Sequence, residues 1–197
     1  MPRLLLLIPL LLAGVIACSP VRVTDYQDLE PRLEMQEFFR GDLVAYGVVK
    51  DRGGRVIRMF SADIIATWED GQGVLDERFL FNDGERDTRK WVLTPRSDNE
   101  YAATAGDVIG EGELAVSGNS VFLDYVLRIP YGDGSVDVRV DDRMYLVAPG
   151  VLLNESQMTK FGVRVGSLLL VILQADKKTV SSPSGQAGQY AVKGELQ

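Results

Sequence analysis

The chain has 197 residues, of which 28 are acidic and 21 are basic, so its formal net charge is −7. This balance argues against a nucleic-acid partner, which requires a basic surface. The sequence holds no histidine and a single cysteine, Cys18. Nucleophilic sites with a histidine base, zinc sites built from His or Cys, and an internal disulfide are therefore excluded. We expect no cofactor, no metal site and no enzymatic activity.

The first residues predict an export signal that ends at a lipidation site. Arg3 precedes an apolar run over residues 4–16, and Ala17 is the small residue that a signal peptidase requires. The run is too short to span a bilayer. The pattern that ends at Cys18 resembles a bacterial lipobox, so residues 1–17 are predicted to be a signal peptide and Cys18 a lipidated mature N-terminus. An ordinary secretory signal that ends at Ala17 is the alternative.

Lipidation predicts that the mature protein is held on a membrane surface in the cell envelope. Two or more acyl chains, palmitate among them, anchor a protein stably, whereas one chain binds only marginally. Ser19 follows the cysteine. Under lipoprotein sorting rules, serine in place of aspartate at this position favours the outer membrane, facing the periplasm. Residues 18–27 are polar and have no clear period, which predicts a tether.

The pattern over residues 28–175 predicts one all-β domain with a short N-terminal helix. The helix is expected within residues 28–40, with Asp28 as its N-cap. After Gly41, apolar or alternating runs are separated by Gly, Asp and Asn, which supply the positive φ of tight hairpins. The predicted strands are 42–50, 55–68, 74–81, 86–94, 100–108, 113–116, 120–129, 136–147, 151–155 and 163–174. Residues 176–197 have no period and are predicted to be a disordered tail.

Alternation within these runs indicates strands that are buried on one side. Val121, Leu123 and Tyr125 share one face of the run 120–129, whereas Asp124 and Arg128 share the other. Sequential strands joined by short turns favour an antiparallel up-and-down, lipocalin-like barrel of about 8–10 strands, because closure removes exposed edges. A β-sandwich is the alternative. Barrels of about eight strands enclose enough space for side chains or for one small ligand.

Several short motifs occur in an order that indicates a family resemblance. They are Phe38-Phe39-Arg40-Gly41, Asn82-Asp83-Gly84-Glu85, Arg89-Lys90-Trp91, Thr104 to Gly110, Asp141-Asp142-Arg143-Met144-Tyr145 and Lys160-Phe161-Gly162. Over residues 36–174 the chain resembles a bacterial family of uncharacterised lipoproteins defined by a domain of unknown function. The resemblance implies a lipocalin-like barrel in the cell envelope and no established activity. Family members often carry Trp at the positions of Asp124 and Arg143, and their genes accompany enzymes that modify membrane fatty acids, which implies a lipid-related role.

Two groups of side chains are candidates for a ligand site. The first is aromatic and suits an apolar molecule; it consists of Trp68, Trp91, Tyr101, Phe122, Tyr125 and Tyr145. The second is polar, and its groups can pair with one another or bind an acyl carboxylate; it consists of Arg89, Asp107, Asp141, Asp142, Arg143 and Lys160. The alternatives are core packing for the aromatic residues and structural ion pairs for the charged ones.

The sequence therefore predicts a membrane-anchored lipoprotein that binds or carries a hydrophobic small molecule, a fatty acid or lipid, in the cell envelope. One alternative is an envelope scaffold or interaction protein that binds no ligand and has a packed barrel interior. The other is an enzyme that uses carboxylates such as Asp107 and Asp141 on an envelope lipid or glycan. The pattern leaves the oligomeric state open.

Overall fold

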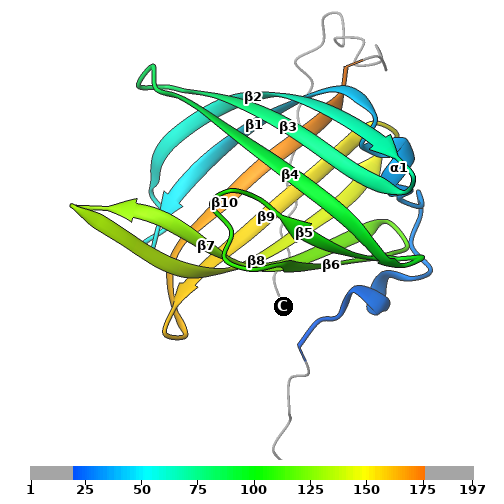
Figure 1. The fold of residues 1–197 in the computed structure, drawn as a ribbon. Helices are drawn as coiled ribbons and strands as arrows, with labels where there is room; N and C mark the ends of the chain where they lie inside the picture. Colours follow the sequence, from blue (N-terminus) through cyan, green and yellow to red (C-terminus); the bar gives the residue numbers. More distant parts are fainter. Residues whose placement is uncertain (1–19, 176–197) are drawn as a thin grey trace, which may run out of the picture.

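A computed structural model of the chain describes residues 20–175, and within them ten antiparallel strands form a closed barrel (Figure 1). The strands follow sequence order around the barrel, and pairing of β1 with β10 closes it. The predicted up-and-down barrel is confirmed, and the sandwich alternative is wrong. The predicted signal peptide, Cys18 and the predicted tail over 176–197 lie outside the described residues.

The helical elements are short and the strands are long. The helical elements are η1 (Val23–Tyr26) and α1 (Met35–Phe38). The strands are β1 (Gly41–Asp51), β2 (Val56–Glu69), β3 (Gln72–Phe81), β4 (Arg86–Ser97), β5 (Glu100–Thr104), β6 (Gly112–Ser117), β7 (Ser120–Tyr131), β8 (Gly134–Ala148), β9 (Val151–Lys160) and β10 (Val163–Gln174). Between residues 20 and 175, no helix is long and apolar enough to cross a membrane.

The helix expected within residues 28–40 is limited to the single turn of α1. Glu34, its N-cap, is extended, with φ −99° and ψ 111°. Pro31 also disfavours helical backbone in the residue before it. The helix therefore begins only at Met35, and the chain before it runs across the end of the barrel.

The connection between β5 and β6 completes the barrel wall beside β7. The predicted strand 100–108 ends at Thr104, and the chain then turns toward β7. Val108 forms an isolated bridge with Leu127, and the backbone N–H of Arg128 donates to the carbonyl of Asp107 at 2.8 Å. These bonds fix the backbone of Asp107, and so the position from which its side chain extends.

Alternate residues of each strand point inward and form one hydrophobic core. At the end where β1 begins, which we call the α1 end, Phe38 and Phe39 are buried beneath the turn of α1. The indole Nε1 of Trp68 donates to the carbonyl of Phe39 at 2.5 Å, and the Gln174 amide donates to the carbonyl of Phe38 at 2.8 Å. These bonds hold α1 to β2 and β10, so α1 closes this end as a plug.

The opposite end of the barrel is filled by aromatic side chains. The ring centroid of Phe60 lies 5.5 Å from that of Phe79 and 5.8 Å from that of Phe81. The guanidinium of Arg58 stacks 3.5 Å from the Phe81 centroid. Gly47 permits this packing, because a Cβ there would lie within 2.5 Å of the Phe60 ring. Because these side chains fill the opposite end, an interior cavity can form only in the part of the barrel nearer the α1 end.

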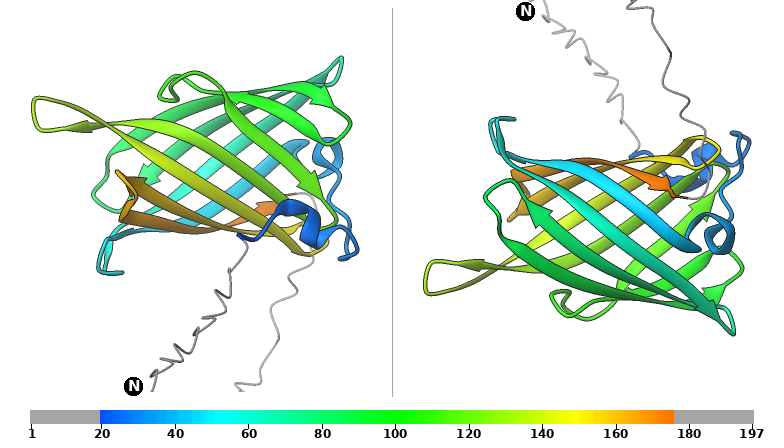
Figure 2. Two further views of the ribbon diagram at one scale, coloured as in Figure 1. Left: turned by 90° about the horizontal axis from the view of Figure 1, so that it is seen from below. Right: turned by 90° about the horizontal axis from the view of Figure 1, so that it is seen from above.

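The N-terminal segment lies against the outside of the barrel (Figure 2), where η1 contacts β6 and β7. The ring centroid of Tyr26 lies 5.6 Å from that of Phe122 and 5.5 Å from that of Tyr145. The Arg143 guanidinium stacks 4.0 Å from the Phe122 centroid and donates to the carbonyl of Val21 at 3.3 Å. Residues 21–26, at the end of the predicted tether, are thus packed on β7 and β8.

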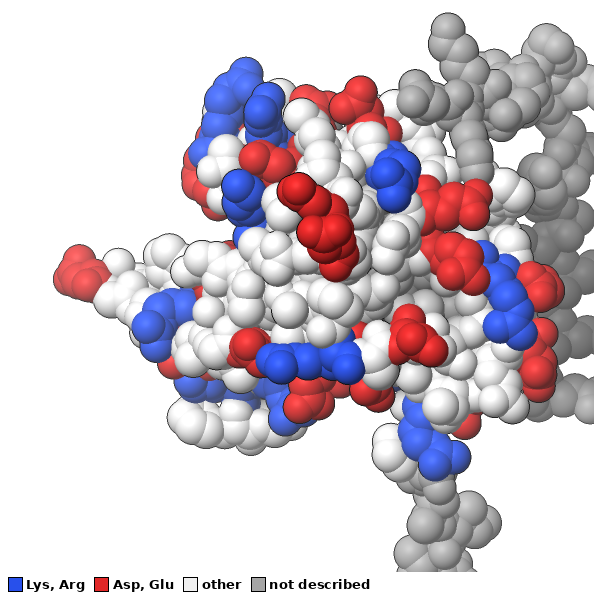
Figure 3. All heavy atoms as spheres, turned by 45° about the vertical axis from the view of Figure 1, so that its right-hand side comes forward, with Lys and Arg blue, Asp and Glu red and all other residues white. Residues whose placement is uncertain are grey.

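The face shown in Figure 3 carries acidic and basic side chains interspersed with uncharged surface. Ion pairs also form on the surface of the barrel. Arg58 lies 2.9 Å from Asp83 and 2.5 Å from Glu85, and Arg96 lies 2.5 Å from Glu111. Such exposed pairs add little to stability, so the fold depends on the core and on the strand ladder.

Replacing Gly118 tests the docking of the N-terminal segment. Gly118 has φ +55°, and a Cβ at this position would clash with the backbone carbonyl of Tyr26. Gly132 has φ +56° and open space around it. Gly132→Ala is expected to cost about 1 kcal/mol from backbone strain alone, and Gly118→Ala a further 1–3 kcal/mol or so from the displaced backbone. Urea unfolding of both variants measures the difference, and equal losses would contradict the docked arrangement.

Candidate functional site

Polar side chains occur on the inward face of three strands, β3, β8 and β9. Glu77 lies between the inward-facing Leu75 and Phe79 of β3, and Asp142 continues the inward face of β8 after Val140. Asn154 faces inward on β9, directly opposite Met144 of β8 in the strand register. Period-two alternation brings these groups into the interior, where water is scarce.

These side chains line a cavity of about 100 Å³ in the barrel interior. Most of the lining is apolar, and the polar groups come from β3, β4, β7, β8 and β9. The lining consists of Met35, Phe39, Leu75, Glu77, Arg89, Trp91, Leu93, Leu114, Val121, Leu123, Tyr125, Asp142, Met144, Asn154, Leu168, Leu170 and Ile172. An apolar wall with a few polar groups is typical of small-molecule sites.

Asp142 is the most deeply buried acid in the cavity wall, with 7% of the residue exposed. Its Oδ1 accepts hydrogen bonds from the Asn154 amide and, at 2.8 Å, from the Ser156 hydroxyl. Burial raises the pKa of the Asp142 carboxyl to about 6, and the two hydrogen bonds limit the rise. Its other oxygen, Oδ2, accepts no hydrogen bond from any described residue, so it is available to a molecule in the cavity.

Glu77 lines the same cavity, and no hydrogen bond or ion pair joins its carboxyl group to another of residues 20–175. The residue is half-buried, and it lies directly opposite Arg89 in the register of β3 and β4. Desolvation raises the pKa of the Glu77 carboxyl to about 7. The Arg89 charge opposes this shift, whereas the charges of Asp142 and Asp107 add to it.

Arg89 is engaged by Asp107, which the β5–β6 connection places beside β4. Its Nε and Nη2 donate to Asp107 Oδ2 at 3.0 and 2.5 Å. Desolvation lowers the pKa of Arg89, but the negative groups around it outweigh that effect and the pKa is raised. Asp107 Oδ1 is buried and accepts no hydrogen bond within the described part of the chain. The pair therefore retains unused acceptor capacity.

Tyr125 completes the polar part of the cavity from β7. Its ring packs edge-on against Trp91, with centroids 5.3 Å apart. Desolvation, reinforced by the Asp142 charge, raises the pKa of its phenol, so the hydroxyl remains protonated. Within residues 20–175 this hydroxyl makes no hydrogen bond, and it lines the cavity with Asp142.

The cavity is polar at its inner part and apolar toward the α1 end. On β8 and β9, Met144 and Leu152 lie closer to the α1 end than Asp142 and Asn154 do. Met35, on α1 itself, lines the cavity at that end. A bound molecule would therefore have its polar group deep in the barrel and its apolar part toward the plug.

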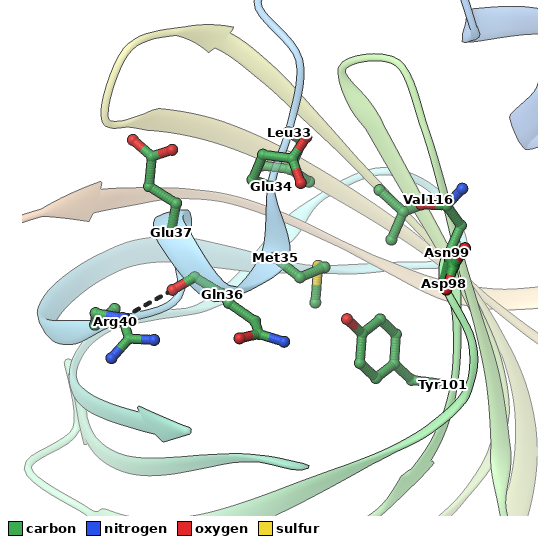
Figure 4. Close-up of a pocket in the computed structure, with 10 residues that line it drawn as sticks. All are labelled: Leu33, Glu34, Met35, Gln36, Glu37, Arg40, Asp98, Asn99, Tyr101 and Val116. Atoms are coloured by element: carbon green, nitrogen blue, oxygen red, sulfur yellow. Dashed lines mark hydrogen bonds between the residues drawn. The ribbon is translucent and has the colours of Figure 1, made fainter. Parts of the chain in front are cut away.

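An open pocket of about 510 Å³ lies outside the plug, between α1 and the β4–β5 turn (Figure 4). Met35 lines both this pocket and the inner cavity, so its side chain separates them. Figure 4 shows the Met35 side chain and the Tyr101 hydroxyl pointing toward one another. The Arg40 side chain donates to the carbonyl of Gln36 at 3.0 Å, which fastens the end of α1.

The sequence relates this barrel to known proteins. Residues 12–174 match the family described as "Protein of unknown function (DUF3833)". The chain belongs to the DUF3833 family. No curated protein matches the chain.

Two solved structures show where the fold of this DUF3833 chain recurs. An S-type phycobiliprotein lyase from Guillardia theta is similar over 75% of this chain and 96% of its own, with a TM-score of 0.55 and 13% identity. The Rv2717c protein from M. tuberculosis is similar over 75% of this chain and 99% of its own, with a TM-score of 0.50 and 16% identity. At such identities the likeness shows the fold alone, a lipocalin-like barrel.

The structure brings together only some of the residues predicted from the sequence. Arg89, Trp91, Tyr125 and Asp142 line the cavity, and Asp107 pairs with Arg89 beside it. Trp68 and Tyr101 pack edge-on at the α1 end with centroids 5.8 Å apart. Tyr101 lines the outer pocket rather than the cavity.

The remaining predicted residues lie away from the cavity. Asp141 and Arg143 form an ion pair at 2.8 Å on the outer face of β8, where Arg143, Phe122 and Tyr145 support the N-terminal segment. Lys160 lies at the opposite end of the barrel and donates to the carbonyl of Asp137 at 2.5 Å. The expectation of a single polar cluster is therefore corrected. Asp141 and Asp142 are adjacent in sequence, so their side chains point to opposite sides of the sheet.

Sequence analysis missed Glu77, Asn154 and Ser156. Each stands on the inward parity of a strand whose other inward residues are apolar, such as Leu75 and Phe79 beside Glu77. The available signal was a polar residue at a position where the alternation of the strand predicts an apolar, inward-facing one. Among the described residues, no group of three or more His, Cys, Asp or Glu is placed to hold a metal ion.

The raised pKa of Glu77 predicts a pH-dependent stability. Its ordinary value is 4.5 and its folded value is about 7, so the folded state binds this proton more tightly than the unfolded state. The associated stability is present below about pH 4.5 and is lost as pH rises through about 7. Glu77→Gln should remove up to about 3 kcal/mol of that loss. Urea unfolding at several pH values measures it.

The matched control for this prediction is Asp76→Asn, which removes a carboxylate from the other face of the same strand. This variant should keep the wild-type loss of stability between pH 4.5 and 7. If Glu77→Gln gave the same pH profile as the wild type, the half-buried, unpaired position of Glu77 in the cavity wall would be contradicted.

Proposed function

We propose that this chain binds a hydrophobic small molecule inside its barrel, without catalysing a reaction, as a lipoprotein attached to the outer membrane. The observation that carries the proposal is the interior cavity, whose walls are mostly apolar and whose inner part presents polar groups that are only partly hydrogen-bonded within residues 20–175. The fold shared with a phycobiliprotein lyase is compatible with a small-molecule ligand. A lipid or related amphiphile suits a cavity of this two-part character.

The size of the cavity limits how such a ligand binds. About 100 Å³ is well below the roughly 300 Å³ of a typical small ligand pocket. The cavity therefore receives one compact group, and a longer ligand must displace side chains near the plug. Met35 and Met144 are suited to this, because methionine is unbranched and adapts its shape readily.

The outer pocket supplies the route into the cavity. Met35 lines both spaces, so rotation of one side chain would connect them. The hydrogen bonds of Trp68 and Gln174 to the carbonyls of Phe39 and Phe38 hold the plug in place during this movement. In this proposal the ligand enters past Met35, and its tail then lies against the apolar side chains next to the plug.

The lipobox that ends at Cys18 supports the proposed anchoring. Acylation of Cys18 would hold the barrel within a short distance of the membrane, because residues 21–26 are packed on β7 and β8. A hydrophobic ligand could then pass between membrane and barrel over a short path.

An interaction role is the second candidate, and an apolar patch on the outer face favours it. Val48 of β1 lies in direct register with Met59 of β2 and with Leu169 of β10. Met59 is 51% exposed, Leu169 is 44% exposed, and the nearby Tyr46 is 54% exposed. Contiguous exposed apolar residues often mark a contact surface.

Bound ligand can be sought directly in protein purified from cells. Exported protein carrying Cys18→Ala is isolated from the periplasm and studied by native mass spectrometry, followed by organic extraction. A stoichiometric hydrophobic molecule is expected. Leu170→Trp should reduce its occupancy about tenfold or more by filling the cavity, whereas Leu169→Trp on the outer face should not. Protein that stays empty after incubation with envelope lipids would favour the interaction role.

Anchoring is tested by fractionation. Wild-type protein is expected in the outer-membrane fraction, and Cys18→Ala protein in the soluble periplasmic fraction, because acylation of Cys18 is the proposed anchor. Ser19→Ala serves as the control and should remain membrane-bound. Membrane association of the Cys18→Ala protein would overturn the proposed anchor.

A further inference from the structure

We propose that the inner part of the cavity binds a head group that donates hydrogen bonds, a primary ammonium above all, and that it disfavours a carboxylate. This inference rests on the proposed function, because it identifies the chemical class of the molecule that the barrel takes up. It is carried by the polar atoms that line the cavity and lack partners.

Within residues 20–175, three carboxyl oxygens of the cavity wall accept no hydrogen bond, and the donors without a partner are Arg89 Nη1 and the Tyr125 hydroxyl. Within residues 20–175, neither oxygen of Glu77 has a hydrogen-bond donor, and Asp142 uses only Oδ1. Asp142 is 7% exposed and Tyr125 is 8% exposed, so these groups obtain little help from bulk water. Carboxyl oxygens that face a poorly hydrated cavity are stabilised by hydrogen-bond donors. A head group with several N–H donors supplies what both carboxyl groups lack.

The one described cation in the cavity wall is already paired. Arg89 donates through Nε and Nη2 to Asp107 Oδ2, at 3.0 and 2.5 Å. Glu77 and Asp142 have no comparable cation within 4.0 Å in the described part of the chain. Glu77, Arg89, Asp107 and Asp142 form the charged cluster of the cavity. When Glu77 and Asp142 are both ionised, this cluster carries a net negative charge.

The sign of that charge decides between head groups. A carboxylate would add a further negative charge next to Glu77 and Asp142, and it would compete with Asp107 for Arg89. Like charges repel strongly in a poorly solvated interior. An ammonium carries three N–H donors and a positive charge, so it can bond to both carboxylates at once. The fatty acid considered from the sequence is therefore the less suitable ligand.

The depth of the cluster also fits a head group rather than an ion from solution. Apolar side chains, among them Leu93, Met144 and Ile172, line the cavity between the cluster and the plug. Beyond the cluster the barrel is filled by Phe60, Phe79 and Phe81. A molecule that reaches the carboxylates must place apolar atoms along the cavity, so the expected ligand is an amphiphile with its amine innermost.

Three probes with the same chain and different heads test this inference. Octylamine, octanol and octanoate are titrated into Cys18→Ala protein by calorimetry at pH 8 and physiological salt. This pH is above the pKa values of Glu77, about 7, and Asp142, about 6, so both carboxyl groups are ionised. The amine is protonated at the same pH. Octylamine is expected to bind at least tenfold more tightly than octanoate, with octanol between them.

Variants assign the effect to the cluster. Glu77→Gln and Asp142→Asn should each weaken octylamine binding about tenfold, because each removes a charge-assisted hydrogen bond. Glu155→Gln is the matched control: Glu155 lies between Asn154 and Ser156 on β9 but is exposed on the outer face, and its replacement should leave affinity unchanged. If Asp142→Asn does not fold, Glu77→Gln and the three-probe comparison still decide the question.

The outcomes separate this inference from the proposed function. Octanoate binding as tightly as octylamine, with both abolished by Leu170→Trp, would overturn the head-group inference and leave the barrel a carrier. Octylamine binding that is unaffected by Glu77→Gln and Asp142→Asn would also overturn it. Failure of all three probes, together with protein that is empty when purified, would overturn the proposed function itself.

Discussion

Closure of the barrel by pairing of β1 with β10 is the constraint on which the rest of the structure depends. This ladder joins residues 43–51 to residues 166–174, from the two ends of the domain. It leaves no free edge strand, and it fixes which residues of every strand face inward. Because side chains alternate between the two faces of a strand, one residue of offset would turn its apolar set toward water. Closure therefore defines both the core and the cavity.

Polar residues on the inward face must find partners inside the closed wall. Asp142 does so through Asn154 and Ser156 of the neighbouring strand, and Arg89 does so through Asp107. Glu77 remains without a described partner, and its elevated pKa reflects the cost of burying a charge. Natural interiors satisfy almost all buried polar groups. A cluster that is only partly satisfied, and that lines a cavity, is thus the feature on which the proposed ligand site rests.

The two ends of the barrel are unequal, and this gives the cavity a direction. Packed phenylalanine side chains fill one end, whereas the other is closed by the segment of α1, where the carbonyls of Phe38 and Phe39 accept hydrogen bonds from Gln174 and Trp68. At the second end, Met35 lines both the interior cavity and the outer pocket. Rotation of one methionine side chain requires less rearrangement than opening a packed aromatic cluster.

The sequence by itself determined the strands, the barrel and the parity of most side chains, because alternation and turn residues are local properties. It also brought Arg89, Trp91 and Tyr125 forward as candidates. Only the tertiary structure decided which charges meet. Asp107 reaches Arg89 through a connection that leaves β5 early, and Asp141 is separated from Asp142 by the sheet itself. Such contacts depend on strand register and on the path of a loop, which involve residues distant in sequence and leave no periodic signal.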